Sequence, residues 1–158
     1  MQLSHTRPVA SALFDDPNLV SCAGLVPVAA LAQRCGLAEL ADRHLSVPTD
    51  KGAHAGAKVS ALVAGMVAGA DSIADMALLR HGAMGTVFAR PYAPSTLGSF
   101  LRAVTFGHVR QLDAVATRLL ESLGEHTPLL AGIDGTVMVD LDDTIIEVHG
   151  YAKQGSGY

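Results

Sequence analysis

The sequence predicts a mostly helical region up to about residue 128, followed by the opening strands of an α/β fold that is cut short. Before Pro128, apolar residues recur at helical spacing in several segments, whereas after it they alternate with polar ones. Apolar residues make up 49% of the 158 residues and charged residues 16%, which excludes an intrinsically disordered chain. We therefore expect two parts, residues 1–128 and residues 129–158.

The first predicted helices are short. Asn18–Val28 is compatible with a small strand or hairpin. Val28–Cys35 has helical apolar spacing, with Pro27 in its first turn and Gly36 as its stop signal. Leu37–Leu45 is predicted as a second helix.

The middle of the chain has the strongest helical pattern. One predicted helix buries a stripe of apolar residues at i, i+3, i+4, i+7 and i+8, namely Val59, Leu62, Val63, Met66 and Val67. Asp71 or Ser72 is expected to cap a following helix that runs through Leu79. Ser95 should cap a helix that carries Leu97 and Phe100, and Gly107 should separate it from a helix ending at Gly124.

The period of two appears in the last thirty residues. Val137, Val139 and Leu141 alternate with Met138, Asp140 and Asp142, and Thr144–Val148 is rich in β-branched residues. Both stretches are predicted as strands. Two strands need further strands or a covering helix to be stable.

Charge and cysteine usage limit the function classes. The net charge of −4 lies entirely in residues 129–158, which taken alone argues against nucleic-acid binding, as does the lack of Trp. The two isolated cysteines and the absence of a secretory signal or membrane span predict a cytoplasmic protein with no membrane partner.

An acidic cluster follows the first predicted strand. Asp140 and Asp142 would share one strand face, with Asp143 on the other. Carboxylates at the end of a rigid strand are typical Mg²⁺ ligands, although an aspartate-rich solvated turn explains the pattern equally well. The spacing Asp-x-Asp-x-Thr also resembles the first motif of haloacid-dehalogenase-type phosphatases, in which Asp140 would be the nucleophile and Asp142 the general acid/base.

A wider resemblance covers almost the whole chain. The blocks KVSALVAGMVAGADSIADMALLRHGAM, APSTLGSFLRAVTFGHVRQLDAVATRLL and VDLDDTIIEVHGYAKQGSGY resemble, in order, the N-terminal half of bacterial insertion-sequence transposases of the DDE type, in DDE domain group 1. The resemblance implies a helical N-terminal region of residues 1–128 for DNA binding or dimerisation. It implies that residues 129–158 begin a ribonuclease-H-like catalytic domain.

The same resemblance assigns site residues. It makes Asp142 the first catalytic acid and Asp140 the runner-up, both as ligands of Mg²⁺, with Asp134 a weaker match. In such enzymes two Mg²⁺ ions assist cleavage and joining of DNA strands. No acid follows Glu147, so the second Asp and the Glu of the triad are missing. We therefore expect a truncated form that is inactive in transposition.

Basic residues supply the candidate DNA contacts. Arg102, Arg110 and Arg118 lie eight residues apart and would contact phosphates if their helices align, although a solvated helix face is the simpler interpretation. Lys153 is a further candidate. The expected partner is DNA at the terminal inverted repeats of the element, with a homodimer as a further possibility. The alternative function is a non-catalytic DNA-binding or dimerisation fragment.

Overall fold

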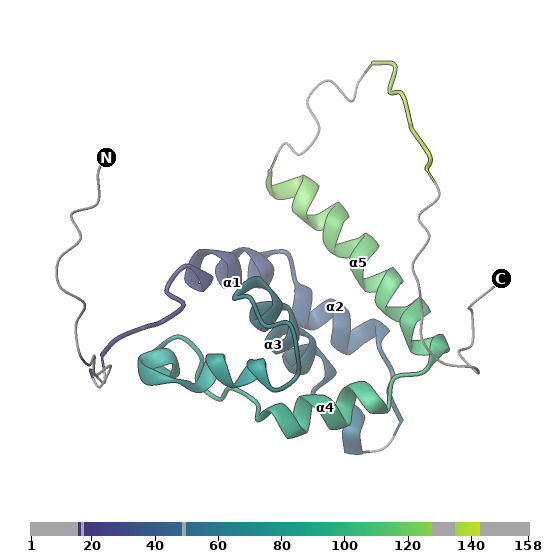
Figure 1. Ribbon diagram of the computed structural model, residues 1–158. Helices are drawn as coiled ribbons and strands as arrows, with labels where there is room; N and C mark the ends of the chain where they lie inside the picture. Colours follow the sequence, from purple (N-terminus) through teal and green to yellow (C-terminus); the bar gives the residue numbers. More distant parts are fainter. Residues whose placement is uncertain (1–15, 17, 49, 128–134, 143–158) are drawn as a thin grey trace, which may run out of the picture.

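The computed structural model describes residues 16, 18–48, 50–127 and 135–142, and every regular element within these ranges is a helix. The 3₁₀ helices are labelled η. The order is α1 (Leu25–Arg34), α2 (Leu37–His44), η1 (Asp50–Gly52), α3 (Ala55–Val67), η2 (Asp75–Arg80), η3 (Gly82–Thr86), α4 (Pro94–Arg102) and α5 (Phe106–His126) (Figure 1). None of these helices is long and apolar enough to cross a membrane.

The predicted α/β fold class is wrong for the described residues. Val137–Leu141, expected as a strand, forms no strand, and the side chains of Val139 and Leu141 are 76% and 89% exposed. A strand is stable only beside a partner that takes up its backbone hydrogen bonds, and the described part of the chain offers none. The second predicted strand, Thr144–Val148, lies outside the described residues.

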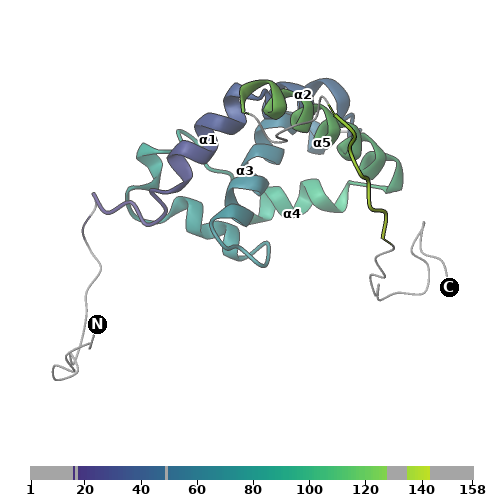
Figure 2. The same ribbon diagram turned by 90° about the horizontal axis from the view of Figure 1, so that it is seen from above.

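Helix α3 forms the centre of the helical body. Figures 1 and 2 show it in the middle, and it contacts α1, α2, α4 and η2. One apolar cluster joins its first half to α2, α4 and α5 through Val59, Phe100 and Val115. A second cluster joins its second half to the start of α1 and to η2 through Leu25, Met76 and others. The two clusters lie at the two ends of α3.

The close crossing of α2 and α3 depends on a glycine. A Cβ atom on Gly56 would lie 2.1 Å from the backbone oxygen of Ala38, so no other residue fits without displacing backbone. Asp42, on α2, accepts a hydrogen bond from the Gly56 backbone N–H over 2.7 Å. A side chain of α2 thereby satisfies a free donor in the first turn of α3.

The boundaries of α1 and α2 are close to the predicted ones. Gly36 separates the two helices with a left-handed φ of 76°, as the stop signal predicted. The small strand considered for Asn18–Val28 is absent, because α1 already begins at Leu25 and turns precede it.

The predicted buried stripe on α3 is only half right. Val59 is buried, but Val63, Met66 and Val67 are 36%, 68% and 53% exposed. The inner positions of the second half are Ala64 and Gly65 instead. The reason is the side chain of Met76, which occupies the place where a Cβ on Gly65 would lie.

Two predicted helix starts also differ. The helix expected from Asp71 or Ser72 is a 3₁₀ helix that begins at Asp75, although Ser72 does hydrogen-bond the Asp75 carboxylate. Helix α4 begins at Pro94, whose fixed φ suits the first helical position, so Ser95 lies inside the helix and does not cap it.

The break before α5 lies earlier than predicted. Helix α4 ends at Arg102, and α5 begins at Phe106, so Gly107 is the second residue of α5 and does not interrupt a helix. Thr105 flanks the start of α5 with extended backbone. Helix α5 then continues through Gly124 to His126.

Candidate nucleic-acid interface

The acidic candidates Asp140 and Asp142 lie on an exposed segment outside the helices. Both are exposed, and residues 136–142 have no regular structure. The rigid strand on which the metal and phosphatase interpretations relied is therefore absent from the described residues. Asp134, Asp143, Glu147 and Lys153 lie outside the described part of the chain.

The described residues do not assemble a metal site. Within them, no three His, Cys, Asp or Glu side chains lie close enough together to hold an ion. Asp140 and Asp142 are the described members of the Mg²⁺ site that the transposase resemblance implies, and that site stays a prediction. No catalytic step through Mg²⁺ can be assigned to them.

The arginine candidates lie on two helices. Arg102 ends α4, where its Nη2 donates a hydrogen bond to the Ser99 hydroxyl over 3.2 Å. Arg110 lies in the second turn of α5 and is exposed. Three residues separate the end of α4 from the start of α5, so these two helix ends adjoin (Figure 1). Arg102 is the last residue of α4, and Arg110 is the fifth residue of α5.

Arg118 lies apart from the other two. It is eight residues beyond Arg110, which places it about 12 Å further along α5 and about 80° around the axis. Its Nη1 donates to the Ala114 backbone oxygen over 3.0 Å. The same half of α5 carries Glu121 and Glu125, so the local charge there is not positive. Arg102 and Arg110 thus lie near adjoining helix ends, with the Arg102 guanidinium turned back along α4 toward Gly98 and Ser99, and Arg118 lies further along α5.

Two side chains of α5 fasten its start to the chain that follows α2. Gln111 Oε1 accepts the Ser46 backbone N–H over 2.9 Å, and His108 Nε2 lies 3.0 Å from the Ser46 backbone oxygen. His108 Nδ1 accepts the Thr105 backbone N–H over 2.9 Å, so Nε2 is the nitrogen that donates to Ser46. These bonds fix the beginning of α5 beside the end of α2.

This fastening brings a further arginine into the same region. Arg43 is in the last turn of α2, is exposed, and precedes Ser46 by three residues. Arg110 is one residue from Gln111 on the other side of the contact. Both arginines therefore flank the junction of α2 and α5.

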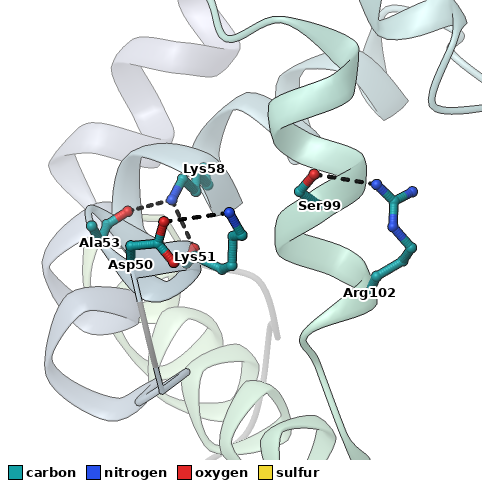
Figure 3. A network of polar contacts seen from close by, with 6 residues as sticks. All are labelled: Asp50, Lys51, Ala53, Lys58, Ser99 and Arg102. Atoms are coloured by element: carbon teal, nitrogen blue, oxygen red, sulfur yellow. Dashed lines mark hydrogen bonds and ion pairs between the residues drawn. The ribbon is translucent and has the colours of Figure 1, made fainter.

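A buried lysine holds η1 beside α4. Lys58, on α3, is 6% exposed, and its Nζ donates to the backbone oxygens of Lys51 and Ala53 (Figure 3). The same Nζ lies 5.4 Å from the centre of the Phe100 ring of α4. Lys58 thus holds the η1 turn beside α4, and Figure 3 shows the Ser99 and Arg102 side chains on the other side of the α4 ribbon.

We call this region the basic end, defined by Arg43, Lys51, Arg102 and Arg110. Its members come from α2, η1, α4 and α5. Lys51 is paired with Asp50 over 3.3 Å, so the three arginines carry most of its available charge. Sequence spacing indicated Arg102 and Arg110 but missed Arg43 and Lys51, because no local pattern links positions so far apart.

Comparison with known proteins adds no assignment, since no family model, curated protein or solved structure matches the chain. Guanidinium groups at exposed helix ends suit phosphate oxygens, which they bind through paired hydrogen bonds.

Proposed function

We propose that the helical body is the DNA-contacting region of a DDE-type insertion-sequence transposase, and that it contacts DNA phosphates through the basic end. The observation that carries this proposal is that Arg43, Arg102 and Arg110 are all exposed and lie near the ends of three helices that meet around the start of α5. The three sequence blocks that resemble such transposases support the same function.

The charge balance sets the expected strength of binding. Residues 18–127 contain nine Lys or Arg and eight Asp or Glu, so the body is nearly neutral and its cations act locally. A few phosphate contacts give weak binding that falls steeply with salt. We therefore expect binding at low ionic strength that is largely lost at physiological salt.

Contacts to phosphates position a protein on DNA but do not read its sequence. The basic end should thus hold the terminal inverted repeat of the element and unrelated duplex DNA with similar affinity. Any preference for the inverted repeat would come from residues outside the basic end.

The catalytic half of the proposal is carried by the resemblance alone. In such a transposase, Asp142 would contribute to a Mg²⁺ site for phosphoryl transfer, with Asp140 as the alternative. The protein would be cytoplasmic. The non-catalytic alternative, a DNA-binding or dimerisation fragment, needs only the helical body. Mg²⁺-dependent nicking of terminal DNA that is lost in Asp142→Ala would favour the enzyme, and DNA binding without nicking would favour the fragment.

The DNA contact is tested by fluorescence anisotropy with a labelled duplex over a range of salt concentrations. The full chain should bind with a logarithm of the association constant that falls linearly with the logarithm of salt. Arg102→Gln and Arg110→Gln should each weaken binding and reduce this slope by about one. Both losses should be equal for inverted-repeat and unrelated DNA.

The matched control is Arg118→Gln, which removes the same charge from the same helix as Arg110→Gln but outside the basic end. Its binding should equal that of the unmodified chain. Absence of salt-dependent binding at low salt, or an equal loss for Arg118→Gln and Arg110→Gln, would overturn the proposed contact.

A further inference from the structure

The exposed surfaces of α1 and α3 carry almost no charge. The ten residues of α1 contain one charged residue, Arg34, at the last position. The thirteen residues of α3 contain one, Lys58, and its side chain is buried. Helices that face water normally carry a polar face, so two adjacent helices without one indicate a surface that is covered by a partner.

A groove runs between these two helices. Its volume is about 360 Å³, and the segment after η3 closes one side of it. Small residues such as Ala29, Ala32 and Ala61 line its walls together with Val28 and Val63. Val28 and Val63 are 39% and 36% exposed, so the apolar lining continues onto the outer surface. Small side chains in the walls permit close approach of another helix.

The walls of the groove hold one acid and one base from different parts of the fold. Glu39 comes from the first turn of α2, and Arg90 comes from the segment between η3 and α4. Both residues are exposed. Within the described part of the chain, neither side chain makes an ion pair or hydrogen bond. The groove is therefore neutral overall but carries one free charge of each sign.

We propose that this groove is the contact surface of a homodimer, covered by the same surface of a second copy of this chain. In a two-fold contact each residue meets its counterpart reciprocally. Glu39 of each copy can then face Arg90 of the other, while the apolar walls meet without bringing like charges together. DNA is disfavoured as the occupant because the acid cancels the single base.

This proposal does not rest on DNA binding. The groove involves α1, the start of α2, α3 and residues 88–92, and none of the four residues of the basic end lines it. A chain that fails to bind DNA can still dimerise here. Anisotropy tests the basic end, and the state of association tests the groove.

The first experiment is sedimentation velocity of the full chain over a concentration series. The unmodified chain should dimerise reversibly. Val63→Glu should weaken the dimer at least about tenfold, because it places two carboxylates in an apolar contact. The matched control is Leu120→Glu on α5, outside the groove, where the side chain is 61% exposed. This variant should dimerise like the unmodified chain.

The second experiment exchanges the charges of two exposed side chains. Because both side chains are exposed, the substitutions should leave the stability of the fold unchanged. Glu39→Arg and Arg90→Glu should each weaken the dimer, and the double variant should restore it, since the reciprocal pairs reform with opposite sign. A chain that is monomeric at every concentration would overturn the proposal. So would a dimer that is insensitive to both single variants, a double variant no better than the singles, or a monomer whose groove binds an added apolar peptide.

Discussion

The two halves of α3 are held in the helical body by different kinds of contact. The first half meets backbone: Gly56 lies against Ala38, and Lys58 donates hydrogen bonds to two carbonyl groups of the η1 turn. The second half meets side chains: Gly65 lies against the sulfur of Met76, and Val63 is part of an exposed wall. Backbone atoms cannot move aside, whereas a methionine side chain can.

This difference follows the two surfaces that α3 supports. Its first half positions η1 and α4, and so fixes the cations of the basic end. Its second half forms a wall of the groove proposed for dimerisation. A helix can thus place charges rigidly at one end and leave adaptable packing at the other. The predictions below test whether the two halves respond to substitution as differently as their contacts suggest.

The largest effect is expected from the pair Gly56→Ala and Gly65→Ala. Both add one methyl group to an inward position of the same helix, and alanine favours the helix over glycine by at most about 0.5–1 kcal/mol at either position. At Gly56 the new Cβ meets the Ala38 backbone oxygen at 2.1 Å, and at Gly65 it meets the Met76 sulfur at 2.2 Å. Gly56→Ala should therefore lower the free energy of unfolding by about 3 kcal/mol, and Gly65→Ala by less than about 1 kcal/mol.

Urea unfolding followed by circular dichroism measures both values. The distances are nearly equal, so only the mobility of the neighbouring atom separates the two variants. Equal losses for Gly56→Ala and Gly65→Ala would contradict the distinction between the two halves of α3.

The second prediction concerns the polar contacts of the first half. Lys58→Met keeps a long apolar side chain over Phe100 but removes both hydrogen bonds to Lys51 and Ala53. The free energy of unfolding should fall by about 1–3 kcal/mol, because the carbonyl groups of Lys51 and Ala53 lose a charged donor. Arg43→Met, at an exposed position, should change it by no more than about 0.5 kcal/mol.

Lys58→Met should also weaken DNA binding, since Lys58 holds η1 in the basic end without reaching the surface itself. The variant should unfold in a single transition, so that binding can be measured on folded protein. If its stability equals that of Arg43→Met, the bonds of Lys58 to η1 do not hold the first half of α3.

Local patterns in the sequence predicted the helices well and their surroundings poorly. Apolar spacing and Gly36 located α1 and α2 to within a few residues. The exposed side of α3 was assigned wrongly at Val63, because spacing identifies an apolar face but not the partner that covers it. Met76, which occupies the inner side, is eleven residues from Gly65 and gives no local signal of that contact.

The site was predictable only where its residues are near in sequence. Arg102 and Arg110 are linked by adjoining helices, so spacing indicated them together. Arg43 joins them through hydrogen bonds of Ser46 with His108 and Gln111, a contact across more than sixty residues. The strand around Asp140 was predicted from alternation alone, which is insufficient because a strand also needs a neighbour.

The smallest effect is expected at Asp75, in the η2 helix that packs on the second half of α3. Hydrogen bonds from the hydroxyl and then the backbone N–H of Ser72 hold the pKa of the Asp75 carboxyl below its ordinary value of 3.8. A carboxyl whose pKa is lower in the folded state stabilises the fold fully above pH 3.8, and this contribution is lost as the pH falls through the folded value.

Asp75→Asn should therefore reduce stability at pH 6, and the difference from the unmodified chain should shrink towards pH 3. Urea unfolding at both pH values measures it. The effect should be small because the carboxyl is exposed to solvent, which screens its interactions. In a Ser72→Ala background, which lacks the hydroxyl donor, the pH-dependent part should decrease. A difference that is the same at pH 6 and pH 3 would show that the turn before η2 gains nothing from this charge, and that the second half of α3 is held by packing alone.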